Sequence, residues 1–449
     1  MENDRFFVKS LKLENFRCFE NVELGPFDPH FNLLVGANGA GKSSVLLALA
    51  DIFRPLAALG GVLSSDRILN SRDNRAIPAL YQNRPQSTSV YPWKLTAEFE
   101  WDAEVFKVTD ESVPHPAFEY QPKLFRMNSA NSAEIIGGLQ SGMFSSRVEL
   151  IIFYRVERRF NNIYREEDVF SQNPKSAAYL NWLDAGQSSK ALREWMRDQT
   201  IIDLQLARLR EGSPVGTPDL SGLHRASPSP LSIVRDAIRE AVEGAREIEY
   251  DGQRKDLTVR LSDGRVLEFA GMSDGQRALI GMVADIARRA CVLRGDETDI
   301  DVLTQTTGIV LIDELDLHLH PKWQRHIVGA LKRIFPKIQF FATTHSPQVI
   351  GEARPEEIVL LTPEGQKRPI GSYGMDSNWV LECVMEAEGR DPAIARRIKQ
   401  LFDAIDDDRL QDARDMIASL RADIGEAPDI VGAESYLWRI EHQGDEAAE

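Results

Sequence analysis

The sequence of 449 residues is long enough for two or three domains, and its hydrophobic (43%) and charged (27%) contents are those of a soluble globular protein. No run approaches the roughly 18 consecutive apolar residues of a membrane span, and the N-terminus lacks the apolar core of a secretory signal. The net charge of −16 disfavours a protein that binds nucleic acid over its whole surface, although it leaves room for a local basic groove. Three widely spaced cysteines fit a reducing cytosol and offer no metal-ligand spacing, so we expect a cytoplasmic protein without a membrane segment.

The chain opens with predicted β-structure. Residues 5–12 and 20–25 predict a hairpin whose turn lies near Arg17, and the apolar run 31–35 predicts a buried strand. Arg17 could approach a nucleotide or simply lie on the surface, and the sequence does not decide between these interpretations.

A phosphate-binding pattern follows this strand. The sequence GANGAGKSS leads into a predicted helix over 42–53. It contains the pattern G-x-x-x-x-G-K-[ST] between a strand and a helix. Glycines let backbone N–H groups turn toward a phosphate, and the helix directs its positive end at the same anion. Lys42 is expected to reach the β- and γ-phosphates and Ser43 to ligate Mg²⁺. The alternative is a glycine-rich turn that binds nothing. The expected nucleotide-contacting residues are Asn38, Gly39, Ala40, Gly41, Lys42, Ser43 and Ser44.

The next hundred residues are less regular. Residues 55–90 and 112–147 carry many turn-forming residues and predict irregular segments. The alternating stretch 93–108 predicts a hairpin at a sheet edge, and 148–154 predicts a short buried strand.

An arginine-rich stretch comes after this strand. Its arginines either pair with the glutamates around them or contact a phosphate of nucleotide or nucleic acid. The arginines are Arg155, Arg158, Arg159 and Arg165, and the glutamates are Glu157, Glu166 and Glu167.

Helical and linker segments occupy the middle of the chain. Apolar residues at three- and four-residue steps predict helix within 176–211, and residues 212–230 have the composition of a linker. A helix over 231–245 then precedes three short predicted strands. These strands lie near 247–250, 257–261 and 266–269.

A second possible anion site lies at the start of the next helix. Ser273 and Gly275 place a hydroxyl and a backbone N–H at a helix N-terminus, although an ordinary N-cap is the alternative. The sequence MSDGQ resembles the signature motif of ABC-type ATPases, written L-S-G-G-Q, which in that family closes over the γ-phosphate held by the other subunit. The resemblance assigns Ser273, Gly275 and Gln276 to the neighbour's nucleotide. Met272 and Asp274 depart from the pattern, and aspartate at that position is common in the RecF-like branch.

Two acids end a predicted buried strand at 309–312. Asp313 and Glu314 at a strand's carboxyl end, with no base beside them, are costly to bury unless a cation is present. Asp313 fits a residue that organises Mg²⁺ through water. Glu314 fits the group that orients or deprotonates the attacking water.

The segment LDLHLHP follows the two acids directly. Its histidines, His318 and His320, could suggest a transition-metal cluster, but H-x-H without a distant third ligand is a weak signal. We prefer a loop that contacts another subunit, similar to the D-loop of ABC-type ATPases, followed by one helix from His320-Pro321 to Ile334. A last buried strand, 338–342, precedes His345. This histidine is either structural or corresponds to the switch histidine of the family, which contacts the γ-phosphate.

These motifs occur in order over residues 6–362 and resemble an ATPase head of the RecF, SMC and OLD branch of the ABC-type superfamily. The resemblance implies an α/β P-loop NTPase fold, with a mixed sheet, flanking helices and an antiparallel edge subdomain, over residues 1–365. An irregular and helical insertion at about 155–228 would interrupt it. It also implies ATP and Mg²⁺ as ligands, and a homo-oligomer in which two heads sandwich two ATP molecules. On this basis the catalytic residues are Glu314, His345 and Lys42, and the metal-binding residues are Ser43 and Asp313.

A finer resemblance concerns three stretches, DELDLHLHPKWQ, FATTHSPQVI and SYGMDSNWVLECVMEAEGRDP. They are similar to the ATPase subunits of Septu anti-phage systems and their retron-associated relatives. Such systems imply a separate small HNH-type nuclease as a partner, and DNA contacts made through the complex. The C-terminal region, 366–449, is expected to be helical and either to cap the head or to dock this nuclease. Its expected helices lie around 376–388, 391–405, 409–422 and 430–440.

Missing features narrow the function further. No paired D-x-D on a strand follows His345, so we expect no Toprim-type nuclease in this chain, and the insertion is too short for an SMC-type coiled coil. No Q-loop of a transporter ATPase can be identified. Two alternatives stay open: a RecF-like repair ATPase that loads onto DNA alone, and a nucleotide-gated scaffold with little turnover, which needs the same residues.

Overall fold

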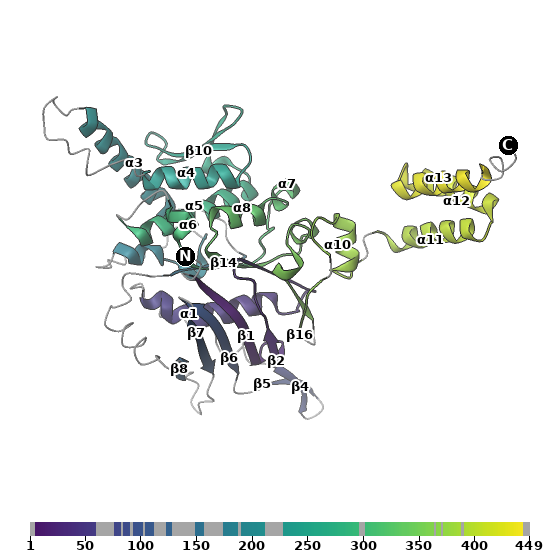
Figure 1. Ribbon diagram of the computed structural model, residues 1–449, viewed down its shortest axis with the longest axis horizontal. Coiled ribbons are helices and arrows are strands. Elements are labelled where there is room, and N and C mark those ends of the chain that lie inside the picture. Colours follow the sequence, from purple (N-terminus) through teal and green to yellow (C-terminus); the bar gives the residue numbers. More distant parts are fainter. Residues whose placement is uncertain are drawn as a thin grey trace. The chain divides into compact units, whose positions relative to one another are not determined.

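The computed structural model describes fourteen stretches of the chain, which divides into two compact units, Met1–Ser377 and Asn378–Glu449 (Figure 1). The described residues are 5–59, 76–81, 84–89, 93–101, 104–111, 123–127, 149–156, 174–186, 190–211, 228–295, 301–362, 365–369, 371–387 and 390–442.

An antiparallel sheet with the strand order β2-β1-β6-β7-β8 begins the first unit. The expected N-terminal hairpin is present, and so is the hairpin expected within 93–108. The second hairpin lies inside the sheet and not at its edge. Its strand β6 pairs with β1, and its strand β7 pairs with β8, which the sequence analysis did not predict. The strands are β1 (Phe6–Phe16), β2 (Phe19–Leu24), β6 (Lys94–Trp101), β7 (Glu104–Glu111) and β8 (Lys123–Met127).

A separate hairpin of β4 (Ala76–Tyr81) and β5 (Arg84–Ser89) lies where an irregular segment was expected. Each strand carries one proline, Pro78 in β4 and Pro85 in β5. Proline has no N–H to donate to a neighbouring strand, so its presence argues against a strand in the sequence. A two-stranded hairpin tolerates these residues because each strand has an unpaired edge.

A six-stranded sheet forms the centre of the first unit, with the order β16-β15-β3-β14-β13-β9. All of its strands are parallel except β16. Strands β3, β13 and β14 are buried along their whole length, as the continuous apolar runs predict. The strands are β3 (Phe31–Val35), β9 (Leu150–Tyr154), β13 (Gly308–Ile312), β14 (Ile338–Thr343), β15 (Ile358–Thr362) and β16 (Gly365–Lys367).

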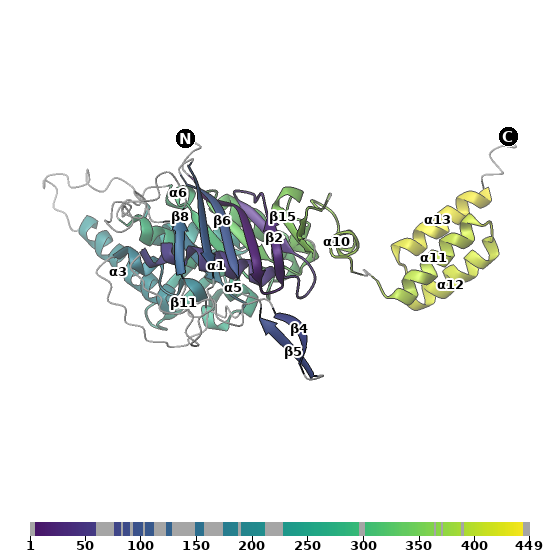
Figure 2. The same cartoon turned by 90° about the horizontal axis from the view of Figure 1, so that it is seen from below.

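Helix α1 (Lys42–Leu59) packs between the two sheets and contacts strands of both (Figures 1 and 2). The Phe53 ring on α1 meets Phe6 and Phe99 edge to face, with ring centroids 5.7 Å and 6.1 Å away. The helix continues beyond the predicted end at Phe53, even though Pro55 usually marks a helix boundary.

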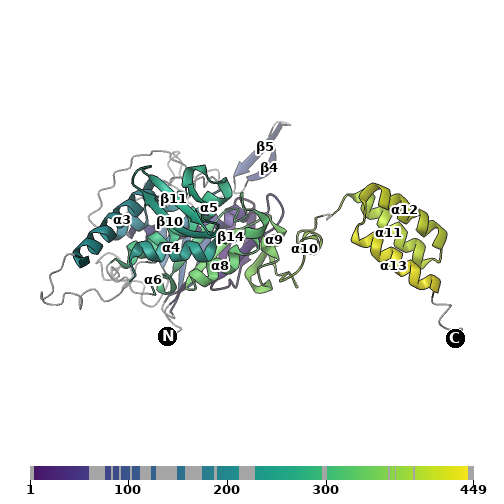
Figure 3. The same cartoon turned by 90° about the horizontal axis from the view of Figure 1, so that it is seen from above.

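Helices α4 and α5 pack together, and α5 contacts the parallel sheet at β9. A small sheet of β10, β11 and β12 lies beside α4 (Figure 3), as the three predicted short strands indicated. The elements are α4 (Pro230–Ala241), β10 (Ala245–Asp251), β11 (Asp256–Leu261), β12 (Val266–Glu268) and α5 (Asp274–Arg294).

Two expected helices are interrupted. Within 176–211 the chain first forms two short 3-10 turns, broken by Asn181 and Gly186 in left-handed conformations, and α3 (Lys190–Glu211) begins only afterwards. The helix expected to run to Ile334 is divided into α7 (Pro321–Gln324) and α8 (Ile327–Ile334).

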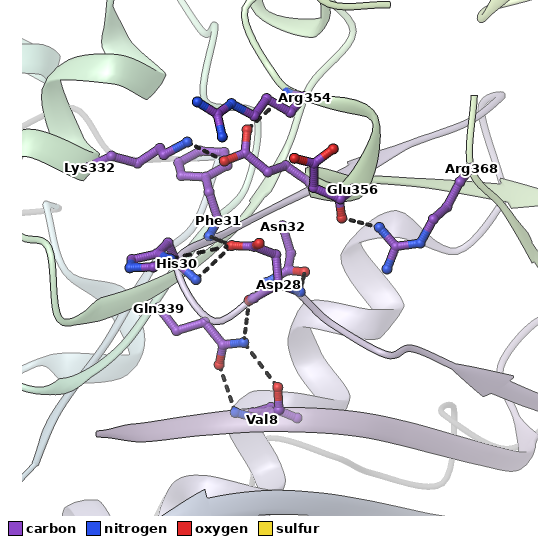
Figure 4. Close-up of polar contacts among 11 residues, drawn as sticks. Val8, Asp28, His30, Phe31, Asn32, Lys332, Gln339, Arg354, Glu356 and Arg368 are labelled. Carbon is purple, nitrogen blue, oxygen red and sulfur yellow. Dashed lines mark hydrogen bonds and ion pairs between the residues drawn. The ribbon is translucent and has the colours of Figure 1, made fainter. Parts of the chain in front are cut away.

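Gln339 of β14 joins the two sheets at a fully buried position (Figure 4). Its Oε1 accepts the Val8 N–H at 2.7 Å, and its Nε2 donates to the carbonyl oxygens of Val8 at 3.0 Å and Asp28 at 2.9 Å. The pairing of β1 with β6 shifts register between Val8 and Ser10. The Gln339 amide thus bonds to the β1 backbone beyond the residues that pair with β2. The buried Glu357 forms an ion pair with Lys332 of α8.

The second unit contains α10 (Ser377–Cys383) and three mutually packed helices with their own hydrophobic core. The three helices are α11 (Pro392–Asp406), α12 (Leu410–Ile424) and α13 (Pro428–His442). Over the described stretches, no helix has both the length and the apolar character of a membrane span. The first unit has a mixed α/β architecture with an antiparallel sheet beside the central one, as the sequence analysis expected.

Candidate functional site

The phosphate loop leaves β3 and leads directly into α1. Gly39 and Gly41 have φ angles of 84° and 96°, a left-handed conformation that favours glycine. A Cβ on Gly41 would lie 2.4 Å from the Phe19 ring and 2.7 Å from the Cys18 sulfur. The turn of the N-terminal hairpin therefore supports the loop from one side, and Gly41 is needed for this close packing as well as for its φ angle.

Lys42 is largely buried in this loop, with 8% of its surface exposed. Its Nζ donates to the carbonyl oxygens of Gly36 at 2.8 Å and Ala37 at 3.1 Å. Burial lowers the pKa of the Lys42 ammonium, and the charges of Asp313 and Glu314 only partly oppose this. The ammonium is thus held inside the loop, where a phosphate could replace the two carbonyl oxygens.

Asp313 lies at the carboxyl end of β13 and meets the phosphate loop. Its Oδ1 accepts hydrogen bonds from the Ser43 hydroxyl at 3.1 Å and from the Thr343 hydroxyl at 2.6 Å. The structure therefore brings together Ser43 and Asp313, the two residues expected to hold Mg²⁺. They meet because β3, β14 and β13 are parallel neighbours whose carboxyl ends share one edge of the sheet.

Thr343 is a residue of the site that the sequence analysis missed. Its hydroxyl accepts the Glu314 N–H at 2.7 Å while donating to Asp313. The last residue of β14 thus orients both acids at the end of β13. The available signal was a polar residue at the end of an otherwise apolar strand. Glu314 itself has a left-handed φ of 51°, which costs free energy for a residue other than glycine and marks a constrained position.

His345 follows β14 at the same edge of the sheet and is exposed. Asp316 holds its loop, because the Asp316 Oδ1 accepts the His345 N–H at 3.3 Å and also the Thr344 hydroxyl. Gln324 reinforces this arrangement by donating to the carbonyl oxygens of Asp316 and Leu319. The γ-phosphate contact of the imidazole stays a prediction.

Ser273 caps α5, the helix that follows the signature-like sequence. Gln276 and Ser273 form a reciprocal capping box, in which each backbone N–H donates to the side chain of the other residue, at 3.2 Å and 3.3 Å. A Cβ on Gly275 would lie 2.0 Å from the His318 carbonyl oxygen. The start of α5 therefore packs against the D-loop-like segment of the same chain, a role for Gly275 that its sequence pattern did not indicate.

His318 and His320 do not form a transition-metal cluster with the nearby acids. His320 caps α7, where its Nδ1 accepts the Lys322 N–H at 3.2 Å, and His318 is exposed with a left-handed φ of 62°. Over the part of the chain with assigned positions, no three His, Cys, Asp or Glu side chains gather as a metal site.

Of the arginines proposed to contact glutamate or phosphate, only Arg155 falls within the described residues. Its Nε lies 3.7 Å from the Asp184 Oδ1, so its ionic partner is an aspartate that the sequence analysis did not name. Arg158, Arg159 and Arg165 lie outside the described residues. Arg17, in the hairpin turn, places its guanidinium 5.9 Å from the centre of the Phe16 ring.

The donor set fits a magnesium nucleotide. A serine hydroxyl and a carboxylate are the hard oxygen ligands that Mg²⁺ accepts, and Ser43 and Asp313 already face each other. The loop offers backbone N–H groups and a buried ammonium to phosphate oxygens. Apart from Gly39 and its two chain neighbours, no atom of the described chain lies within 4 Å of the position that a Cβ on Gly39 would take.

Comparisons with known proteins agree with this chemistry. A family model described as "AAA domain, putative AbiEii toxin, Type IV TA system" matches residues 155–351, and one described as "AAA domain" matches residues 10–98. The retron Ec83 probable ATPase of Escherichia coli is 31% identical over 430 residues, which cover 87% of this chain and 78% of that protein.

Two further matches are more distant. The Septu protein PtuA of Bacillus mycoides is 24% identical over 347 residues, which cover 76% of this chain and 38% of that protein. A crystal structure of an SMC head bound to the C-winged helix domain of ScpA matches with a TM-score of 0.46 and 17% identity, covering 81% of this chain and 97% of that one. The chain therefore belongs to the family of the retron ATPases.

Proposed function

We propose that the chain binds ATP with Mg²⁺, hydrolyses it to ADP and phosphate, and controls a separate HNH-type nuclease in an anti-phage defence complex. Nucleotide-dependent pairing of two heads would transmit this control. The observation that supports the ATPase most directly is the hydrogen bond between Ser43 and Asp313, which joins the phosphate loop to the acidic end of β13. The defence role rests on the names of the relatives and on the three sequence stretches noted above.

Five residues of one chain would act on the nucleotide bound there. Lys42 would bind the β- and γ-phosphates, and Ser43 and Asp313 would hold the metal. Mg²⁺ held there would supply neutralisation of the phosphate charge. Glu314 orients the attacking water and accepts its proton, and His345 contacts the γ-phosphate.

Signature residues would act on the nucleotide of the partner chain. Ser273 is exposed at the N-terminus of α5, where the hydroxyl and the helix dipole both favour an anion. The hydrogen bonds of Ser273 and Gln276 stay within the helix cap of their own chain. Ser273, Gly275 and Gln276 therefore fit a role in trans, which requires a homodimer or a larger homo-oligomer.

The second unit is the proposed docking site for the nuclease. Its three-helix core is closed by its own side chains, yet α13 also exposes Val431 (45%), Tyr436 (42%) and Trp438 (61%). Exposed aromatic residues are frequent energetic centres of interfaces. A double variant in which serine replaces both Tyr436 and Trp438 should bind the nuclease with an affinity lower by at least about tenfold, and its affinity for ATP should be unchanged. Tyr373→Ser, at an exposed tyrosine (57%) of the first unit, is the control.

The proposed function can be tested by co-expressing the protein with its neighbouring genes and measuring native mass with and without ATP. A complex that contains a small protein with an HNH-type motif supports the proposal. A bare dimer that forms with ATP and binds DNA in a salt-dependent way would instead indicate a RecF-like ATPase. A complex that binds ATP but releases no phosphate would indicate a scaffold.

A further inference from the structure

Tyr154 ends β9 and sits beside the acidic end of β13. In the parallel register Tyr154 pairs with Ile312, and the next residue, Asp313, donates its backbone N–H to the Tyr154 carbonyl oxygen at 2.8 Å. The backbone of Tyr154 therefore helps to fix the position of the carboxylate that faces the phosphate loop.

The side chain of Tyr154 reaches in the other direction, to α5. Its hydroxyl donates to the Asp285 Oδ2 at 3.0 Å, and the whole residue is buried. Burial and the charge of Asp285 hold the pKa of Tyr154 well above its ordinary value, so the hydroxyl remains a donor at neutral pH. Water cannot replace this bond at a buried position, and the cost of losing it is correspondingly larger than at the surface.

Asp285 also anchors two buried arginines of α5. Its oxygens accept from Arg288 Nη2 and from Arg289 Nε, each at 2.8 Å, and Arg289 donates further to the Ala178 carbonyl oxygen. Each of the three charged residues is at most 5% exposed. Burial acts to raise the pKa of Asp285, but the charges of Arg289 and Arg288 outweigh it and set the pKa at about 2. Removing any one of these three charged side chains would leave an uncompensated charge in the interior, which is strongly unfavourable. The cluster therefore fixes the position of this part of α5.

The same helix carries the signature residues at its start. Asp285 lies about three helical turns beyond Ser273, and the intervening residues are largely buried. At its start, Gly275 packs against the His318 carbonyl oxygen. Helix α5 is thus attached at two points to the segment that contains Asp313, through Tyr154 and through His318.

We propose that Tyr154 is a positioning residue that makes the Asp313 carboxylate and the signature end of α5 move as one body. This proposal rests on the proposed function, because it assumes that ATP is bound at Asp313 and that Ser273 serves the partner's nucleotide. Binding of ATP in one chain then fixes where that chain presents Ser273 to the other.

A pair of tyrosine variants in the full-length protein separates this role from a structural one. Tyr154→Phe and Tyr179→Phe each remove one buried hydroxyl that donates a hydrogen bond, to Asp285 in the first case and to the Glu149 carbonyl oxygen in the second. Both should lower Tm by a few degrees and leave the ATP Kd of the dilute monomer within about twofold of wild type. Only Tyr154→Phe should lower kcat and ATP-dependent pairing, by about tenfold.

Hydrogen exchange provides a second measurement that does not depend on how stable the variant is. In dilute wild-type monomer, ATP should slow amide exchange both at the phosphate loop and in the first turn of α5. Protection confined to the phosphate loop, or equal kcat and pairing in the two tyrosine variants, would overturn the role of Tyr154 alone. A wild-type protein that neither binds nor hydrolyses ATP would overturn the proposed function as well.

Discussion

Ser43 and Asp313 are 270 positions apart in the sequence, yet the Ser43 hydroxyl donates a hydrogen bond to the Asp313 carboxylate at 3.1 Å. The contact follows from the strand order, because β14 lies between β3 and β13 and all three strands point the same way. Loops that leave the carboxyl ends of neighbouring parallel strands meet above one edge of the sheet. The predictions below start from this arrangement.

Lys42→Ala should weaken ATP binding by at least about 100-fold, because it removes the buried ammonium that would carry charge-assisted hydrogen bonds to phosphate. Equilibrium binding of a fluorescent ATP analogue measures the effect. Lys107→Ala is the control, since Lys107 forms an exposed ion pair with Glu98 on the antiparallel sheet. Unchanged affinity in Lys42→Ala would place the nucleotide elsewhere.

Glu314→Gln should preserve ATP affinity and lower kcat by about 100-fold or more, because the amide can hold a water but cannot accept its proton. Phosphate release and ATP binding are measured on the same preparation. Glu100→Gln, which alters a half-buried ion pair with Lys9 on the antiparallel sheet, should leave both unchanged. A normal rate of hydrolysis in Glu314→Gln would show that another group is the base.

Gly275→Ala should lower ATP-dependent turnover by about tenfold and the free energy of unfolding by about 1–3 kcal/mol, because the new methyl group would overlap the His318 carbonyl oxygen. Gly271→Ala is the matched control, as a Cβ there meets no atom within 4 Å. Turnover assays and denaturant unfolding of both variants check the prediction. Equal turnover and equal unfolding free energy in the two variants would mean that the close approach of Gly275 to His318 does not affect function.

The cysteines should differ in reactivity toward a thiol-alkylating reagent at pH 8. Burial raises the pKa of the Cys291 thiol to about 12, so only about one molecule in 10,000 carries the reactive thiolate at that pH. Cys383 is exposed and should react readily. Mass spectrometry of partly labelled protein should find Cys383 modified and Cys291 modified only after denaturation. Rapid native labelling of Cys291 would show that α5 opens from its core.

The sequence was sufficient for the parts of the fold that depend on local pattern. A glycine-rich loop between an apolar strand and a helix, and two acids after a buried strand, identify the phosphate loop and the end of β13 without tertiary information. The contact between Ser43 and Asp313 then requires only that their strands be near neighbours in one parallel sheet.

Features that depend on packing escaped sequence analysis. The bonds of Thr343 to Asp313 and Glu314, and the approach of Gly275 to His318, join segments that no spacing rule relates. Helix α1 continues past Pro55, where the local cost of proline predicts an end, and its contacts with strands of both sheets cannot be read from the sequence. The prolines of β4 and β5 concealed a hairpin that only the pairing of its two strands reveals.

The central claim is that ATP bound at the phosphate loop, with Ser43 and Asp313 holding its Mg²⁺, pairs two heads through the signature residues. Sedimentation of the purified Glu314→Gln protein, with Mg²⁺ and with or without ATP, tests it most directly, with Lys42→Ala as the control. We expect ATP to convert Glu314→Gln from the mass of one chain to that of two, and to leave Lys42→Ala unchanged. An unchanged mass of Glu314→Gln at saturating ATP would contradict the account.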